Sequence, residues 1–297
     1  MADMTSCGGS TGGVDRQGRR GGPPGGARVS SGSSFHYSFG LLTSERRSGI
    51  LAVYAFCRAI DDLADEGPID PARSALALET YRDEIERCYS GAPTLQVTRD
   101  FQECVRRFDI PRAPVEDLLD GVAMDLRQSR YRDFEELRLY CCRVASAVGL
   151  ICLPIFGCGD ARSREYAIDL GIALQLTNIL RDLKSDAARG RIYVPLDEIA
   201  ACGYSEEELI KGARTPAFVE LMRRQAARAH RHFESSARLL PEPDRKHLLA
   251  AEVMRAIYLK LLRRIERSEF RVFEGRISVP RLQQLSVALR AWVSGEV

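Results

Sequence analysis

From Ser33 onward the apolar positions of the chain recur at spacings of three and four residues, and no stretch alternates apolar with polar positions. This period predicts helices that pack one face against a core, and it gives no support for strands. Caps, prolines and glycines divide the pattern into roughly ten helices. They are expected at about 44–66, 70–89, 95–108, from 114, from 133, 160–186, from 205, 215–240, 243–270 and 280–293. We therefore predict an all-α fold, a single helical bundle around a central cavity.

The first of these helices carries a polar stripe in an otherwise apolar segment. Tyr54, Arg58, Asp61 and Asp65 are spaced by four, three and four residues, so they fall on one helix face. Two aspartates at i,i+4 cost a helix roughly 0.2–0.5 kcal/mol unless something neutralises them. A divalent cation such as Mg²⁺, which prefers oxygen ligands, would do so. The alternative is a solvated helix edge on which Arg58 neutralises Asp61 or Asp62.

A second helix repeats this design. Gln175, Asn178, Asp182 and Asp186 are spaced by three, four and four residues and again stand among apolar neighbours. Two such helices that face each other across a cavity would hold divalent cations between them. Cations held in this way bind diphosphate and make it a good leaving group. The pair of stripes therefore predicts a metal-dependent diphosphate site.

Two further segments border these stripes. The loop over 188–195 carries two arginines and Tyr193, and it could close over a diphosphate. The stretch from Val144 to Gly159 is nearly uncharged and rich in small residues, so either a bulky ligand or another helix can lie against it. It is too short for a membrane span and contains Pro154.

Composition narrows the class of protein. The chain has 297 residues, 45% of them hydrophobic, and its net charge of +2 gives no electrostatic case for binding nucleic acid. Its nine cysteines are scattered, which indicates a reducing, cytoplasmic compartment without disulfides. Residues 1–32 hold ten of the 24 glycines and no Leu, Ile or Phe. We predict that 1–32 form a disordered Gly/Arg-rich tail and that 33–297 form one catalytic domain.

Four motifs from Ser33 to about Tyr258 resemble the squalene/phytoene synthase family of head-to-head prenyl transferases. They read YAFCRAIDDLAD, DGVAMDL, YCCRVASAVG and LGIALQLTNILRDLKSDAARGRIYVPLDE. The resemblance implies an isoprenoid-synthase-type bundle, three Mg²⁺ ions, and two allylic prenyl diphosphates in one channel. It also implies a chemistry in which an allylic cation alkylates the second substrate and loss of a proton closes a cyclopropane.

The same resemblance assigns roles to residues. Those matching the metal ligands are Asp61, Asp65, Asn178, Asp182 and Asp186. Tyr54 and Arg58 join the four aspartates as catalytic positions. The substrate-binding matches are Ser34, Arg58, Tyr140, Val144, Ala145, Val148, Gln175, Arg181, Arg191, Tyr193 and Tyr258. Ser185 departs from the family, which usually has an acidic residue there.

The product is predicted from a shorter segment. VASAVG at 144–149 resembles the bacterial presqualene diphosphate synthases of the hopanoid route, whereas phytoene synthases usually read VAGTVG. We therefore expect two farnesyl diphosphates to give presqualene diphosphate. The alternatives are a phytoene synthase that joins two geranylgeranyl diphosphates and a complete NADPH-dependent squalene synthase. NADPH is not expected, because no dinucleotide fingerprint is found. A one-substrate terpene cyclase and a catalytically silent interaction protein are alternatives from other classes.

Location and partners follow from the chemistry. Amphiphilic substrates and an apolar product favour peripheral contact with the inner face of the cell membrane, for which the helix of Trp292 is the candidate. Other enzymes of isoprenoid synthesis are candidate partners.

Overall fold

The computed structural model describes residues 42–65 and 71–294, with the side chains of 64–65 and 71–75 excepted, and its regular elements there are helices. They are α2 (Ser44–Asp65), α3 (Pro71–Ser90), α4 (Gln96–Phe108), α5 (Arg112–Arg127), α6 (Phe134–Cys141), η1 (Cys142–Ser146), α7 (Ala147–Phe156), α8 (Arg162–Ala188), α9 (Leu196–Ala201), α10 (Glu206–Ile210), α11 (Pro216–Leu239), η2 (Glu242–Asp244), α12 (Leu249–Arg267) and α13 (Arg281–Ser294). The predicted all-α fold is confirmed. The predicted tail, Ser34 and the Asp65 side chain lie outside the described residues.

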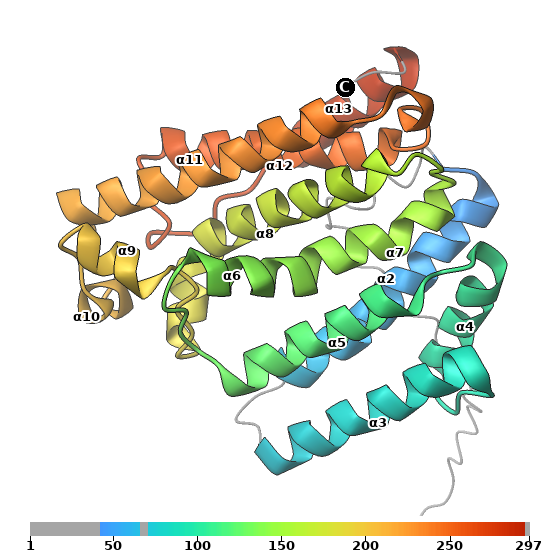
Figure 1. The fold of residues 1–297 in the computed structure, drawn as a ribbon. Coiled ribbons are helices and arrows are strands. Elements are labelled where there is room, and N and C mark those ends of the chain that lie inside the picture. The colour runs from blue at the N-terminus through green and yellow to red at the C-terminus, as the bar shows by residue number, and fades with distance from the viewer. Residues whose placement is uncertain (1–41, 66–70, 295–297) are drawn as a thin grey trace, which may run out of the picture.

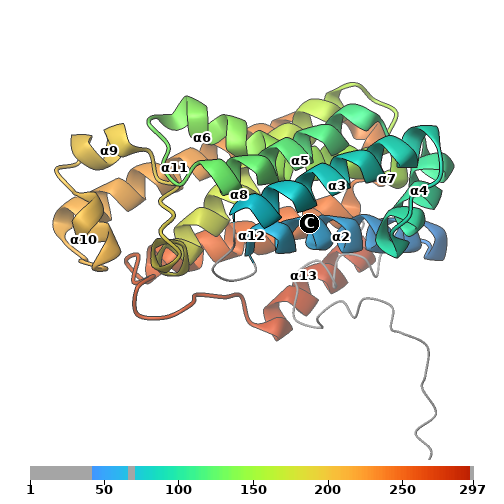
Figure 2. The same cartoon turned by 90° about the horizontal axis from the view of Figure 1, so that it is seen from below.

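The bundle is arranged around α8, the longest helix of the described chain. α8 packs against α7, η1, α11 and α12, while α5 covers the other side of α7 and η1. Figure 1 shows α6 and α7 as one continuous run between α5 and α8, with α2 behind α5 and beside α7, and with α3 and α4 beyond α5. Seen from below, α13 lies at the margin of the bundle, beside α12 (Figure 2). The two helices with polar stripes, α2 and α8, therefore face the same run from different sides.

Two helices begin with side-chain caps at the starts that the sequence predicted, whereas the helix predicted at 243–270 begins only at Leu249. Ser205 forms a capping box with Glu208, and Thr215 caps α11 at the amide of Phe218. Asp160, which precedes α8, accepts a hydrogen bond from the amide of Arg162, the first residue of that helix, at 2.8 Å. The carboxylate that accepts from the amides of Gly159 and Asp160, at 2.9–3.2 Å, is Asp244 of η2.

The run from α6 to α7 contains a π-helical segment, η1, at Cys142–Ser146. Two glycines allow close approach to it. A Cβ on Gly171 of α8 would lie 2.5 Å from the Cα of Ser146, and one on Gly121 of α5 would lie 2.7 Å from Cγ1 of Val144. η1 is therefore wedged between α5 and α8, a position in which π-helical turns often shape functional sites.

The apolar stretch that the sequence predicted to be too short for a membrane span belongs to a longer helical run. Phe134–Phe156 forms one helical run of 23 residues, long and apolar enough to cross a membrane by length and composition alone. In this bundle the run packs against α5 and α8 and contributes to the core.

A buried carboxylate joins α3 to α4. Glu84 is fully buried and accepts hydrogen bonds from the amides of Thr94 and Leu95, at 2.9–3.0 Å, and from the hydroxyl of Thr98. Burial raises the pKa of Glu84, but these hydrogen bonds and one from Arg87 outweigh it and lower the pKa to about 2. Glu84 thus satisfies, from a neighbouring helix, the two amides that lead into α4.

Candidate active site

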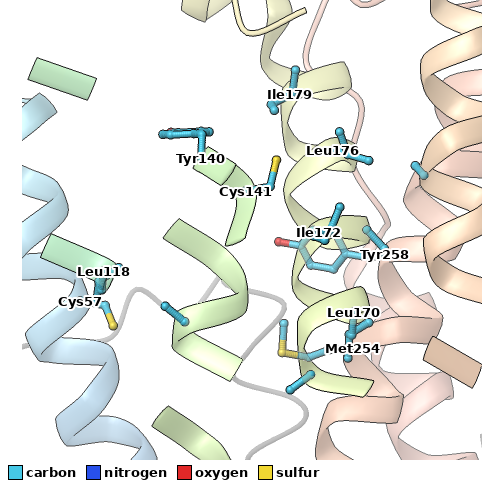
Figure 3. Close-up of a cluster of buried hydrophobic side chains, with 14 of the residues drawn as sticks. Cys57, Leu118, Tyr140, Cys141, Leu170, Ile172, Leu176, Ile179, Met254 and Tyr258 are labelled. Carbon is cyan, nitrogen blue, oxygen red and sulfur yellow. The ribbon is translucent and has the colours of Figure 1, made fainter. Parts of the chain in front are cut away.

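A cavity of about 370 Å³ lies between α2, the η1–α7 run, α8 and α12. Its walls are mainly aliphatic and aromatic. Figure 3 shows Leu170 of α8 beside Met254 of α12, both of which line it. Its described lining residues are Ile50, Val53, Tyr54, Cys57, Arg58, Asp61, Val144, Ala145, Val148, Gly149, Cys152, Leu153, Phe156, Tyr166, Ala167, Leu170, Gly171, Leu174, Gln175, Asn178, Leu248, Ala250, Ala251, Met254 and Tyr258. Pockets of this size and lining bind small apolar ligands.

The structure brings both polar stripes to this cavity. Asp61 from α2 and Asn178 from α8 line it, together with Tyr54, Arg58 and Gln175. The expected wall residues Val144, Ala145, Val148 and Tyr258 line it as well. Nine of the predicted site residues therefore surround one space, although their roles in binding and catalysis stay predictions.

Arg58 is engaged at the edge of this space. Its Nη2 lies 2.7 Å from Oδ1 of Asp62, and both side chains are about half exposed. This is one of the two pairings that the surface alternative predicted. An exposed pair of this kind contributes little to stability, so Arg58 can exchange Asp62 for an anionic ligand at small cost.

The second motif forms a charged network beside the cavity. Arg181 donates to the carboxylate of Asp182 and also interacts with the hydroxyl of Tyr258. Burial lowers the pKa of Arg181, but these two partners more than compensate, so the group stays charged. Arg276, on the segment between α12 and α13, places Nε 3.4 Å from Oδ1 of Asp182. Arg276 was not predicted, because no helical spacing connects it to the motif.

Two observations fit a divalent cation at this motif. The Oδ1 atom of Asn178 is buried and has no hydrogen-bond partner. Burial and the neighbouring Asp182 raise the pKa of Asp186 to about 7, despite the opposing effect of Arg189 and Arg191. The unpaired amide oxygen of Asn178 and the neighbouring carboxylates of Asp182 and Asp186 are oxygen ligands of the kind that a divalent cation prefers. A cation would also reduce the repulsion between the two carboxylates.

The carboxylates do not by themselves form a closed metal cage. Among the described side chains, no three His, Cys, Asp or Glu groups lie close enough together to hold one ion. Mg²⁺ commonly binds one or two carboxylates and completes its shell with water and substrate phosphates. The residues present therefore fit cations that arrive with a diphosphate.

Two predicted substrate residues, Tyr140 and Tyr193, share one carboxylate partner, Asp125. Tyr140 and Tyr193 are not among the described lining residues of the cavity. Their hydroxyls donate to Oδ2 and Oδ1 of Asp125, at 2.9 and 2.7 Å, and their rings stack with centroids 5.0 Å apart beside Tyr131. Both hydroxyls are therefore engaged by Asp125, and the role of the two tyrosines in binding substrate stays a prediction.

Asp125 was missed in the sequence. It belongs to the DGVAMDL motif on α5, and it is an acidic residue in a mainly apolar helix. Its charge also contributes to the raised pKa of Asp186, which places it near the second motif. The sequence signal that could have identified Asp125 is a single carboxylate on the apolar face of its helix.

The loop after α8 is held by backbone contacts with residues 129–131. Ile192 forms an isolated parallel bridge with Arg130, and the amides of Ile192 and Leu196 donate to Ser129 and Tyr131 at 2.9 Å. The backbone amide of Arg191 donates a 2.9 Å hydrogen bond to the carbonyl of Asp186. The predicted Arg191 is therefore held next to the end of the second motif.

The two residues on which the presqualene prediction depended do not face the cavity. Ser146 and Ala147 are each 1% exposed and are absent from its described lining. The hydroxyl of Ser146 donates to the carbonyl of Ile168 on α8 at 2.7 Å. These residues report on helix packing, so they carry no direct information about the substrate.

Comparison with known proteins identifies the family. Its sequence profile, squalene/phytoene synthase, matches residues 29–283. The chain belongs to the squalene/phytoene synthase family. It is 36% identical to phytoene synthase 3, chloroplastic, of Zea mays over 88% of this chain and 62% of that protein. It is also 36% identical to the phytoene synthase of Arthrospira platensis over 83% of this chain and 84% of that protein. The chain thus spans less than two thirds of the Zea mays relative.

Solved structures agree with this family fold. A dehydrosqualene synthase in complex with ligand superposes with a TM-score of 0.77 at 26% identity, covering 89% of this chain and 93% of its own. The squalene synthase HpnC of Alicyclobacillus acidocaldarius gives 0.67 at 28% identity, covering 88% of both chains. The predicted isoprenoid-synthase-type bundle is confirmed.

Proposed function

We propose that this member of the squalene/phytoene synthase family joins two prenyl diphosphates head to head. The observation that carries the proposal is one apolar cavity whose polar end receives Asp61 from α2 and Asn178 from α8. An apolar body suits prenyl chains, and oxygen ligands from two helices suit metal-bound diphosphates. The names of the similar proteins, phytoene, dehydrosqualene and squalene synthases, support the same reaction class.

Basic and acidic residues at the polar end would bind different parts of the metal-bound diphosphate. Arg58, Arg181 and Arg276 bring guanidinium groups to the polar end, where they can pair with diphosphate oxygens. The groups that would hold Mg²⁺ are Asp61, Asp65, Asn178, Asp182 and Asp186. When bound, the ions would neutralise the diphosphate and make it a better leaving group.

The apolar wall protects the reactive carbon centres. Val144, Ala145 and Val148 present aliphatic side chains that exclude water, which would otherwise trap an allylic cation. Tyr54 brings a phenol oxygen to the same wall. The released diphosphate accepts the proton lost during ring closure, either directly or through the Tyr54 hydroxyl, which takes that proton and passes its own to the diphosphate.

For prenyl length, we favour two geranylgeranyl diphosphates, as in a phytoene synthase. The support comes from the two phytoene synthases that are each 36% identical over most of the chain. Two farnesyl diphosphates remain the second candidate, supported by the names of the similar solved structures. The presqualene prediction from the sequence is not confirmed.

The test is product analysis with Mg²⁺ on farnesyl and geranylgeranyl diphosphate in parallel, each with and without NADPH. Phytoene from the longer substrate alone would support our proposal. Presqualene diphosphate that persists with NADPH would support the farnesyl candidate, and squalene formed only with NADPH would indicate a complete squalene synthase. Absence of any condensed product would overturn the proposal.

We propose also that α13 contacts an anionic membrane surface, such as the inner face of the cell membrane. Leu282, Leu285, Leu289 and Trp292 are spaced by three, four and three residues and are 81%, 50%, 55% and 70% exposed. The opposite side of α13 is buried in the bundle. The helix carries two arginines and no acidic residue, which suits anionic lipid better than another protein face.

A further inference from the structure

The cavity extends far from its polar end. On α8, Tyr166 precedes Asn178 by about three helical turns, or about 18 Å along the helix axis. On α2, Ile50 precedes Asp61 by about three turns as well. Both Tyr166 and Ile50 line the cavity, so it runs along most of the bundle.

Helix contacts show which residues close the far end. Gly171 lies against Ser146 and Gly149 lies against Ala167, so the η1–α7 run is antiparallel to the first half of α8. A Cβ on Gly49 would lie 3.2 Å from Cγ2 of Ile155, which places the start of α2 beside the end of α7. The bulky lining residues at this end are Ile50, Phe156, Tyr166 and Leu248.

Tyr166 differs from the other residues at this end because its position is fixed by a hydrogen bond. It is 1% exposed, and its hydroxyl donates to Oε1 of Glu252 on α12 at 2.9 Å. Arg255 holds Glu252 with nitrogen–oxygen distances of 2.7–3.0 Å. Rotation of the ring would leave a buried carboxylate without one of its donors, which is costly. Phe156 has no polar group that could anchor it in this way.

We propose that Tyr166 sets the longest prenyl chain that the cavity accepts, and that Glu252 is the residue that positions its ring. The proposal rests on the proposed function and specifies its substrate range. A prenyl chain that enters from the Asp61 end meets a ring that cannot move aside. A chain that is one isoprene unit longer would need the space that the Tyr166 ring occupies. A close-packed interior cannot make room for five more carbon atoms without a large cost.

The decisive measurement is kcat/KM for farnesyl, geranylgeranyl and geranylfarnesyl diphosphate with Mg²⁺. The ratio of interest is kcat/KM for a given substrate divided by kcat/KM for the preferred substrate of the unaltered chain. In Tyr166→Ala, the ratio for the substrate one unit longer than the preferred one should rise at least tenfold over the unaltered chain. Tyr166→Phe keeps the ring and should change that ratio much less. Glu252→Ala should shift the ratio in the direction of Tyr166→Ala but by a smaller factor, whereas a purely structural role would lower all three rates equally.

Loss of a large buried side chain has its own cost, so a matched truncation is needed. Tyr204 is 4% exposed, donates its hydroxyl to the carbonyl of Ala213, and lies outside the described cavity lining. Tyr204→Ala should reduce stability without changing the ratio. If Tyr166→Ala does not fold, Tyr166→Leu replaces it, with an expected rise in the ratio of at least threefold.

Binding supplies a readout that does not depend on turnover. Thermal stabilisation by each diphosphate with Mg²⁺ should extend to the longer substrate in Tyr166→Ala. A ratio and a stabilisation pattern within twofold of the unaltered chain would overturn the inference while leaving the proposed function intact. If the unaltered chain neither binds nor condenses any of the three diphosphates, the proposed function itself fails.

Discussion

Arg276 reaches back from the segment between α12 and α13 to Asp182 on α8, with Nε 3.4 Å from Oδ1. Lys184 attaches the same segment through a 2.7 Å hydrogen bond to the carbonyl of Phe273. The Arg276 side chain is 71% exposed, so it can leave Asp182 without a large desolvation change. The carboxylate that we propose as a cation ligand is thus paired with a guanidinium that can move to a diphosphate.

We therefore expect Arg276→Ala to weaken diphosphate binding and to raise KM by roughly tenfold, the effect of losing one charge-assisted contact. Arg271 lies on the same segment and pairs with Glu274 at 2.9 Å. Arg271→Ala is the control and should leave KM unchanged. Equal KM values for the two variants would show that Arg276 does not contact the substrate.

Loss of either aspartate motif should abolish turnover. Asp61→Ala and Asp182→Ala each remove an oxygen ligand that no other described group replaces, and we expect kcat to fall at least about 100-fold. Thermal unfolding should show that both variants stay folded. The exposed Asp117 on α5 provides the control, because Asp117→Ala removes a carboxylate outside the cavity. Near-normal activity of Asp61→Ala or Asp182→Ala would contradict the proposed site.

The glycine beneath η1 should be intolerant of a side chain. A Cβ at Gly171 would lie 2.5–2.7 Å from three atoms of Ser146, so Gly171→Ala must displace η1 and the cavity wall that follows it. We expect a loss of unfolding free energy of about 1–3 kcal/mol and lower activity. At Gly159 a Cβ would have no neighbour within 4 Å, so Gly159→Ala should be close to neutral. Chemical denaturation of both variants measures the difference.

Glu84 should make stability depend on pH at the acidic end. Its folded-state pKa of about 2 lies below the ordinary value of 4.5, so its contribution is present above pH 4.5 and is lost as the pH falls towards 2. The shift corresponds to about 3 kcal/mol at neutral pH. Glu84→Gln should therefore be less stable than the unaltered chain at pH 7, with the gap closing below pH 4.5.

Glu79 is the matched control for this experiment. It lies on the same helix but is 66% exposed in its pair with Arg82. Glu79→Gln should have little effect at either pH. A gap between Glu84→Gln and the unaltered chain that stays constant from pH 7 to pH 3 would contradict the assignment.

The exposed face of α13 should bind anionic vesicles. Trp292→Ser combined with Leu285→Ser should lower the partition coefficient on phosphatidylglycerol-containing vesicles at least tenfold, because each large apolar side chain contributes about 1.5–3 kcal/mol when fully buried. Added salt should weaken binding of the unaltered chain through Arg281 and Arg290.

A single exposed leucine elsewhere provides the control for α13. Leu76 on α3 is 70% exposed, and Leu76→Ser should leave vesicle binding unchanged. If the α13 variant binds vesicles as well as the unaltered chain, the membrane contact is excluded. Concentration-dependent dimerisation that disappears in the α13 variant would instead identify a second copy as the partner.

The sequence by itself determined the helical class, the two polar stripes and the family. These features are local, because a carboxylate at i,i+4 on α2 or α8 has one possible face whatever surrounds it. The helix caps are local for the same reason, so the capping box of Ser205 and the cap of Thr215 stand at helix starts that the sequence predicted.

Only the tertiary structure decided which side chains share a space. Arg276 and Asp182 are far apart in the chain, and so are Asp244 and the amide of Gly159 that donates to it just before α8. Ser146 and Val148 stand two positions apart on one run, yet Ser146 bonds to α8 while Val148 lines the cavity. The spacing of residues along a helix determines which side chains share a face. Which of those faces lines a cavity depends on how the other helices pack against it.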